Sequence, residues 1–199
     1  MMPNRVLVEQ GPAVLARTSG ELLGRRPLPT VLTSRPVTFI LGPPESGRTT
    51  VAIRLLGEAA TRVPADQVRK ALTYAARHRR LPGELREARA LLLDDVDFLH
   101  GRLGAVRMLG ALVGERTAAG LRTALCQGRA DTSVTALYSV VDCPLRASVI
   151  LRFPVGRGRR RYVNARCRAR GIDPIRAQEA ITMEPWSYLR VDAYLDGLT

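Results

Sequence analysis

The chain has 199 residues, of which 31 are Lys or Arg and 18 are Asp or Glu, so its formal net charge is +13. Its apolar fraction of 46% is enough for a packed core and excludes a wholly disordered chain, and its length fits one core with at most a small appendage. The basic surplus favours a polyanionic partner such as nucleic acid or an anionic membrane surface, although a GC-rich coding bias explains it equally well, since Lys70 is the only lysine.

Cysteine usage and hydropathy limit the class of protein further. Cys126, Cys143 and Cys167 lie far apart, with no partner at metal-ligand spacing, and indicate buried thiols in a reducing compartment. His78 and His100 also lack ligand partners, so we expect them to be structural or solvated. No apolar run is long enough for a signal peptide or a membrane span, which predicts a cytoplasmic protein that does not contact membranes.

The chain divides into three parts. Residues 1–36 are rich in proline and predict an N-terminal arm with one short helix at 13–23. Over 37–155 apolar strands alternate with helical patterns, which predicts an α/β fold with a parallel sheet between layers of helices. The expected strands are 37–41, 90–94, 121–126 and 148–153, and the expected helices are 48–60, 65–79, 102–116 and 132–140. One more strand belongs between the first two helices, where only a weak pattern at Arg62-Val63 fits.

Residues 156–199 predict a small all-helical piece. It begins with an arginine-rich helix at 156–170, and Asp173-Pro174 is a typical helix start. A last short helix begins near Glu184 and runs through Leu195.

A glycine-rich turn joins the first expected strand to the first expected helix. Its spacing fits the phosphate-binding motif G-x-x-x-x-G-K-[ST] except that Arg48 replaces the lysine. Main-chain N–H groups of such a turn, with the N-terminus of the next helix, bind phosphate oxygens. We expect the broad guanidinium of Arg48 to preserve nucleotide binding and to weaken hydrolysis. The alternative is an ordinary Gly/Pro turn. The predicted phosphate-binding residues are Gly42, Pro43, Pro44, Glu45, Ser46, Gly47, Arg48, Thr49 and Thr50.

Two carboxylates follow the apolar run at 91–93, at the end of a strand where open α/β sheets bind ligands. We expect Asp94 to hold Mg²⁺, directly or through a water, with the hydroxyl of Thr49, and Asp95 to orient an attacking water. Asp97 is expected to face solvent. Together with the glycine-rich turn, this pair predicts a nucleoside-triphosphate site.

The stretch 91–102, LLLDDVDFLHGR, resembles the corresponding segment of the bacterial replication initiator DnaA and its truncated, Hda-like relatives among the AAA+ ATPases. A fourth-strand motif at 125–129 follows at the distance found in that family. The resemblance covers residues 37–199. It implies a P-loop AAA+ core over 37–155, a helical lid over 156–199, and ATP or ADP as the ligand. Because the chain ends at Thr199, without the helix-turn-helix of the full-length initiators, we do not expect it to recognise duplex sequence.

The resemblance also assigns three residues outside the two motifs. It implies that Gln127 senses the γ-phosphate, that Arg190 in the lid reports the nucleotide state, and that Arg146 is the finger that completes a neighbour's site. The alternative for both arginines is an ordinary surface position.

Three functions are compatible with these residues. The first is a DnaA-like AAA+ protein, a slow ATPase at most, that regulates replication initiation or another DNA transaction by nucleotide-dependent assembly with an AAA+ partner or with itself. The second is a pseudo-ATPase that acts as an adaptor or scaffold. The third is DNA binding through the arginine-rich helix, for which the alternative is a solvated helix whose arginines pair with carboxylates of the core.

Overall fold

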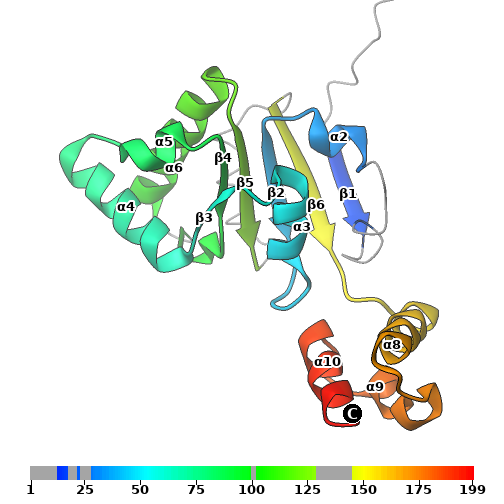
Figure 1. Ribbon diagram of the computed structural model, residues 1–199. Coiled ribbons are helices and arrows are strands. Elements are labelled where there is room, and N and C mark those ends of the chain that lie inside the picture. Colours follow the sequence, from blue (N-terminus) through cyan, green and yellow to red (C-terminus); the bar gives the residue numbers. More distant parts are fainter. Residues whose placement is uncertain (1–12, 18–21, 23–27, 100–101, 129–144) are drawn as a thin grey trace, which may run out of the picture.

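The computed structural model describes residues 13–17, 22, 28–99, 102–128 and 145–199. These residues form an α/β core and a separate group of helices near the C-terminus (Figure 1). The predicted helix at 132–140, together with His100 and Cys143, lies outside the described residues. Cys126 and Cys167 are buried free thiols, as the sequence predicts.

The core is built on one parallel sheet. Its described strands follow the order β1-β6-β2-β5-β4-β3, and every pair in this sheet is parallel. The weak pattern at Arg62-Val63 is a real edge strand, and the last strand starts two residues earlier than predicted. The strands are β1 (Ala13–Arg17), β2 (Val37–Leu41), β3 (Thr61–Val63), β4 (Ala90–Leu93), β5 (Arg122–Gln127) and β6 (Arg146–Leu151).

Helices connect the parallel strands, because each crossover must bring the chain back to the end of the sheet where the previous strand began. The sequence predicts that the helix that follows β2 ends at residue 60, but it ends at Leu56. Gly57 stops it there, with a φ of 95° and an N–H that donates to the carbonyl of Ile53. The core helices are α2 (Thr30–Thr33), α3 (Arg48–Leu56), α4 (Ala65–His78), α5 (Gly83–Glu87) and α6 (Leu103–Ala118), with a 3₁₀ turn η1 (Val96–Leu99) after β4.

Alternate strand residues pack on opposite faces of the sheet. Phe39, Leu91 and Leu125 belong to a cluster that includes residues of α4, α5 and α6. Ile40 and Leu92 belong to a second cluster, with residues of α2 and α3. Both faces are therefore covered, which explains why these strands are nearly continuous apolar runs in the sequence. The predicted three-layer α/β arrangement is confirmed.

The N-terminal segment belongs to the sheet. Residues 13–17 pair in parallel with β6, in a register that runs from Ala13 opposite Ala147 to Arg17 opposite Leu151. The predicted helix at 13–23 is therefore wrong over 13–17. The segment Ala-Val-Leu-Ala-Arg forms a strand because the neighbouring strand offers hydrogen bonds, and this tertiary pairing overrides local preference.

A buried arginine holds together one end of the core. Arg116 of α6 is 0% exposed, and burial lowers the pKa of its guanidinium. It donates to the hydroxyl of Thr123 and to the carbonyls of Leu85, Arg86 and Arg122 at 2.8 to 3.0 Å. This side chain links α5, α6 and the start of β5.

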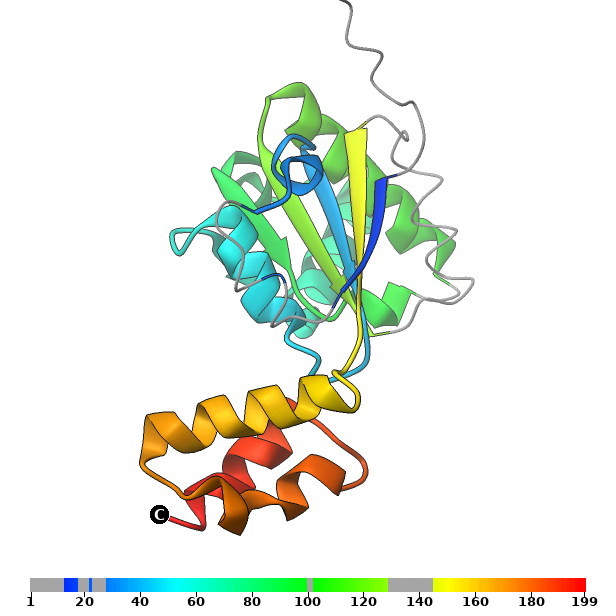
Figure 2. The same ribbon diagram turned by 90° about the vertical axis from the view of Figure 1, so that its right-hand side faces the viewer.

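Residues 156–199, which we call the lid, have a hydrophobic core of their own. Val163 and Cys167 pack there with Trp186 and Val191, and the indole N–H of Trp186 donates to the carbonyl of Ala180. The lid lies beyond the carboxyl ends of the strands (Figures 1 and 2). Its elements are α8 (Arg157–Arg170), the 3₁₀ turn η3 (Pro174–Ala177), α9 (Glu179–Thr182) and α10 (Tyr188–Asp196).

Candidate functional site

The glycine-rich loop connects β2, in the middle of the sheet, to α3. The N–H of Gly42 donates to the carbonyl of Gln127 at the end of β5, which fixes the start of the loop against the sheet. A Cβ at Gly42 would lie 2.7 Å from the hydroxyl oxygen of Ser46 and 3.0 Å from the carbonyl oxygen of Leu151, so only glycine fits. The loop is therefore held close to the ends of β5 and β6.

The end of the loop exposes the N-terminus of a helix. Gly47 has a φ of 86°, which favours glycine, and no side chain caps α3. The first N–H groups of a helix have no acceptor within the helix, and its N-terminus carries a partial positive charge. This turn is therefore suited to an anion such as phosphate.

A cavity of about 700 Å³ lies between this loop and the lid. Asp94 and Asp95 line it, as the sequence predicts for the end of β4, whereas Gly42, Pro43 and Ser46 support the loop without lining the cavity. The loop and α3 residues that line it are Pro44, Glu45, Gly47, Arg48, Thr49 and Thr50. The structure thus brings the two predicted motifs together at the carboxyl ends of the strands.

Arg48 contacts the carboxylates that follow β4. It is 9% exposed, its Nη2 lies 2.7 Å from Oδ1 of Asp95, and its Nη1 lies 3.8 Å from Oδ2 of Asp97. A guanidinium so placed neutralises the carboxylate that the sequence predicts will orient water. Arg48 is therefore one end of an ion pair within the site.

Asp94 is buried, with 3% of the residue exposed. The hydroxyl of Thr49 lies 3.2 Å from its Oδ1 and 3.0 Å from its Oδ2, so the two predicted metal ligands are adjacent. Nε and Nη2 of Arg62 donate to the same Oδ2, at 3.0 and 2.7 Å. The sequence does not predict Arg62 as a site residue, because its three-residue strand gives little periodic signal; a charged residue in the weak pattern at Arg62-Val63 is the available clue.

The side chain of Asp97 is 43% exposed, so the prediction that it faces solvent is correct in part, but it also has partners inside the site. Its carboxylate accepts hydrogen bonds from the N–H of Gly128 at 3.0 and 2.8 Å, which joins η1 to the end of β5. A Cβ at Gly128 would lie 3.2 Å from both Asp97 carboxylate oxygens and from Nη1 of Arg48. A side chain at position 128 would therefore crowd this contact.

The three residues assigned by resemblance lie in different places. The side chain of Gln127 is buried at the end of β5, beside the loop but outside the cavity lining. Arg146 begins β6 opposite Val37, so it lies at the amino ends of the strands, whereas the glycine-rich loop lies at their carboxyl ends. Arg190 is exposed on α10, its Nη1 donates to the carbonyl of Pro185 at 3.2 Å, and it does not line the cavity.

Other lid residues face the cavity instead. Asp192 of α10 accepts hydrogen bonds from Nε and Nη2 of Arg166, at 2.7 and 2.9 Å, and from the hydroxyl of Tyr162 at 3.0 Å. Burial and the charge of Asp192 raise the pKa of Tyr162 well above its usual value. The sequence carried a signal for this set, since Tyr162 and Arg166 on α8, like Tyr188 and Asp192 on α10, are four residues apart on one helix face.

Three of the seven arginines of α8 pair with carboxylates, and all of these carboxylates belong to the lid. Arg159 lies 2.6 Å from Glu184, and Arg170 lies 3.4 Å from Asp192 and 2.8 Å from Asp196. The sequence-based alternative of an ion-paired helix is thus correct for these three arginines, but their carboxylate partners belong to the lid and not to the core, where that alternative placed them.

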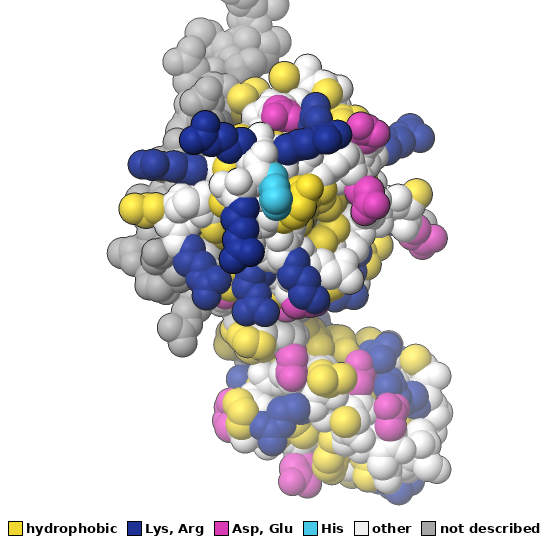
Figure 3. Space-filling model, turned by 90° about the vertical axis from the view of Figure 1, so that its left-hand side faces the viewer, with side chains coloured by type: hydrophobic (Ala, Val, Ile, Leu, Met, Phe, Trp, Pro, Cys, Tyr) yellow, Lys and Arg dark blue, Asp and Glu magenta, His cyan; other side chains and the backbone are white. Residues whose placement is uncertain are grey.

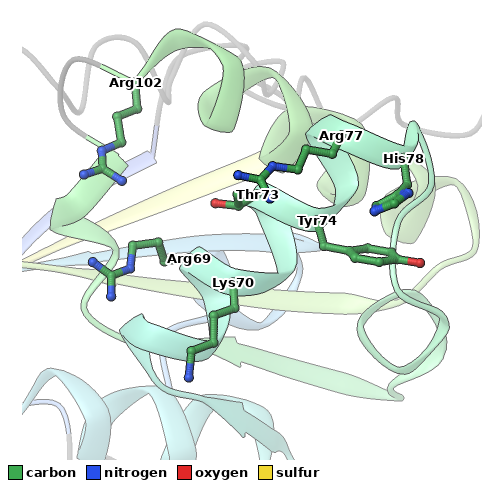
Figure 4. A pocket seen from close by; sticks show the side chains of 7 residues that line it. All are labelled: Arg69, Lys70, Thr73, Tyr74, Arg77, His78 and Arg102. Carbon is green, nitrogen blue, oxygen red and sulfur yellow. The ribbon is translucent and has the colours of Figure 1, made fainter.

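A second basic surface lies on the core, along α4. Figure 3 shows Lys and Arg side chains gathered around a histidine on this face, and Figure 4 shows the groove from close by. The groove has a volume of about 310 Å³, and the rings of Tyr74 and His78 are 4.2 Å apart. Asp66 lies beside it, 3.5 Å from Lys70. The lining residues are Arg69, Lys70, Thr73, Tyr74, Arg77, His78 and Arg102.

Two features are absent from the described residues. No helix within 28–99, 102–128 or 145–199 is long and apolar enough to cross a membrane. In the same part of the chain, no three His, Cys, Asp or Glu side chains gather in a way that could hold a metal ion.

No protein-family model and no curated protein matches the chain, whereas solved structures do. A replication initiator DnaA bound to AMPPCP and single-stranded DNA has 14% sequence identity and a TM-score of 0.65, over 81% of this chain and 54% of that one. Domain III of the Thermotoga maritima replication initiation protein DnaA has 15% identity and a TM-score of 0.59, over 80% and 73%.

A katanin structure concerned with self-assembly has 15% identity and a TM-score of 0.52, over 81% of this chain and 57% of that one. This chain spans about half the length of that AMPPCP-bound DnaA and of the katanin. At these identities the likeness shows the fold, which is the P-loop α/β fold of the AAA+ proteins.

Proposed function

We propose that this chain binds ATP or ADP in the cavity between the glycine-rich loop and the lid. The observation that carries the proposal is the loop itself: Gly42 is fixed against the sheet, and the uncapped N-terminus of α3 opens into a cavity of about 700 Å³. A volume of this size fits a nucleotide. The DnaA structure of similar fold contains AMPPCP, which supports a nucleotide as the ligand.

Nucleotide state then controls assembly, in replication initiation or another DNA transaction, with an AAA+ partner or with a second copy. Lid residues line the cavity, so a bound nucleotide would contact both the core and the lid and would bias their relative position. The position of Arg146, away from the cavity of its own chain, is compatible with a role in a neighbour's site. The similar structures support the proposal by what they are: DnaA initiators, and a katanin that self-assembles.

Calorimetric titration with ATP, ADP and GTP tests the binding. We expect a 1:1 complex with the adenine nucleotides and a loss of affinity of about tenfold or more in Gly42→Val, because the added side chain collides with Ser46 and Leu151. Gly114→Ala is the matched control, since a Cβ there meets nothing within 4 Å. A wild-type protein that releases no heat with either adenine nucleotide contradicts the proposal.

The adaptor function is the second candidate, and the Arg48–Asp95 ion pair favours it. The guanidinium of Arg48 occupies Oδ1 of Asp95 at 2.7 Å, which leaves this carboxylate less free to accept a hydrogen bond from an attacking water. Asp95→Asn separates the two functions. If the chain is an ATPase, this change abolishes turnover; if it is an adaptor, assembly with its partner is unaffected and there is no turnover to lose.

We also propose that the groove along α4 binds the phosphate backbone of single-stranded nucleic acid. Four cationic side chains and an aromatic pair line it, which is the combination that binds phosphates and stacks bases. This surface is favoured over α8, because its cations line an open groove beside an aromatic pair, whereas three of the α8 arginines are paired with carboxylates of the lid. Affinity for a labelled oligonucleotide should fall steeply between about 50 and 200 mM salt; an affinity that does not change with salt contradicts this role.

A further inference from the structure

Arg62 occupies a position in the candidate nucleotide site that neither motif assigns. It is the middle residue of the edge strand β3, its side chain is 56% exposed, and it lines the cavity. Register places it beside Leu92 of β4, and the N–H of Asp94 donates to the carbonyl of Val63 at 3.0 Å. The backbone therefore holds the guanidinium next to the carboxylate that follows β4.

The carboxylate of Asp94 needs a positive partner. It is buried, and an ionised carboxylate away from water is costly unless it is paired and hydrogen-bonded. Arg62 supplies the charge through two hydrogen bonds, and Thr49 adds a hydroxyl. Asp94 is therefore already neutralised within the protein.

A magnesium ion does not fit this set of residues as it stands. Mg²⁺ takes oxygen ligands at near-octahedral geometry and keeps several waters. Thr49 and Asp94 are oxygen ligands of the right kind, but a guanidinium lies on Oδ2 of Asp94 at 2.7 Å, and a second one lies on Asp95 at 2.7 Å. A divalent cation there would meet two positive side chains, and the carboxylates that should attract it are both paired.

We infer that Arg62 takes the place of the divalent cation, so that this site binds the polyphosphate of a nucleotide without metal. The inference rests on the proposed nucleotide binding. Arg62 uses Nε and Nη2 for Asp94, whereas its Nη1 donates to none of the described residues. A guanidinium has five N–H donors in a planar fork, which suits it to hold a carboxylate and a phosphate together. Positive charge fixed to the chain then does what a metal does elsewhere.

The test compares ATP affinity in EDTA with ATP affinity in Mg²⁺, by calorimetry on the full chain. We expect the wild-type dissociation constants in the two conditions to agree within about threefold. Arg62→Ala should weaken binding in EDTA by about tenfold or more, and Mg²⁺ should restore much of the loss, because the freed Asp94 can then hold the ion. Arg62→Lys, which keeps the charge but loses the fork, should lie between the two.

Arg86→Ala is the matched control. Arg86 is 47% exposed and pairs with Glu115 at 2.7 Å, much as Arg62 pairs with Asp94, but it lies outside the cavity. Its affinity in EDTA should equal that of the wild type. Thermal unfolding of each variant shows whether it is folded, and the wild-type comparison needs no variant at all.

Three results overturn the inference, and they are distinguishable from one another. If the wild-type protein binds ATP in Mg²⁺ but not in EDTA, Arg62 does not replace the cation, and the nucleotide site stands. Equal EDTA affinities of wild type and Arg62→Ala show that another group supplies the charge. If the wild-type protein binds ATP in neither condition, the proposed nucleotide site is itself wrong.

Discussion

Helices α4 and α8 are both rich in basic residues, but their side chains have different surroundings. In α8, Arg159, Arg166 and Arg170 reach carboxylates of the lid, at 2.6 to 2.8 Å. In α4, Lys70 has one carboxylate at 3.5 Å, and Arg69 and Arg77 line an open groove. The number of arginines in a segment therefore predicts its charge, whereas the position of the acidic residues decides whether that charge is free to bind a ligand.

Arg116 is more fully paired than any of these arginines, because all of its described acceptors lie inside the protein. Its loss should therefore have the largest effect on stability. We expect Arg116→Met to lower the free energy of unfolding by about 3–5 kcal/mol, since it leaves three carbonyls and a hydroxyl without a donor. Urea denaturation measures the loss. A change below about 1 kcal/mol would show that water replaces the guanidinium at no cost.

A change at Asp192 tests how much the paired arginines of α8 stabilise the lid. Asp192→Asn removes the charge shared by Arg166, Arg170 and Tyr162, and we expect a loss of about 1–3 kcal/mol in the stability of the lid. Tryptophan fluorescence reports it, because Trp186 lies in the lid core. The control is Asp66→Asn, whose carboxylate has one distant partner and should have little effect.

The groove along α4 should show the opposite behaviour. The double change Arg69→Ala and Arg77→Ala should leave stability within about 0.5 kcal/mol. It should lower affinity for a single-stranded oligonucleotide by about tenfold at low salt, because two phosphate contacts are lost. The matched control, Arg160→Ala with Arg161→Ala on α8, should change affinity by about twofold or less. The reverse order of effects would restore α8 as the nucleic-acid surface.

The smallest expected effect is on pH dependence. The hydrogen bond from Arg159 lowers the pKa of Glu184 in the folded protein. A lowered pKa means that the unfolded chain binds the proton more readily, so the contribution is complete above the unfolded value, about 4.3, and is lost as pH falls through the folded value. Glu184→Gln should therefore make lid unfolding slightly less sensitive to acid below about pH 5. An unchanged acid sensitivity would show that this pair adds nothing.

Much of the fold could be predicted from the sequence, because strands buried on both faces give long apolar runs. The glycine-rich loop and the pair at 94–95 could be placed for the same reason, since each follows such a strand. Arg62 could not, because a three-residue edge strand has almost no pattern of its own. The carboxylates that pair with the α8 arginines are 22 to 26 residues away in sequence, and no local signal pairs them with these arginines.

The strand at 13–17 has a practical consequence for work with this protein. The sequence suggests trimming the chain at residue 36, but β1 covers the outer edge of β6. A protein that starts at Val37 would present the N–H and C=O groups of β6 to solvent, and an uncovered strand edge invites pairing with other molecules. Such a protein should aggregate when concentrated, and residues 13–17 are what keep it from doing so.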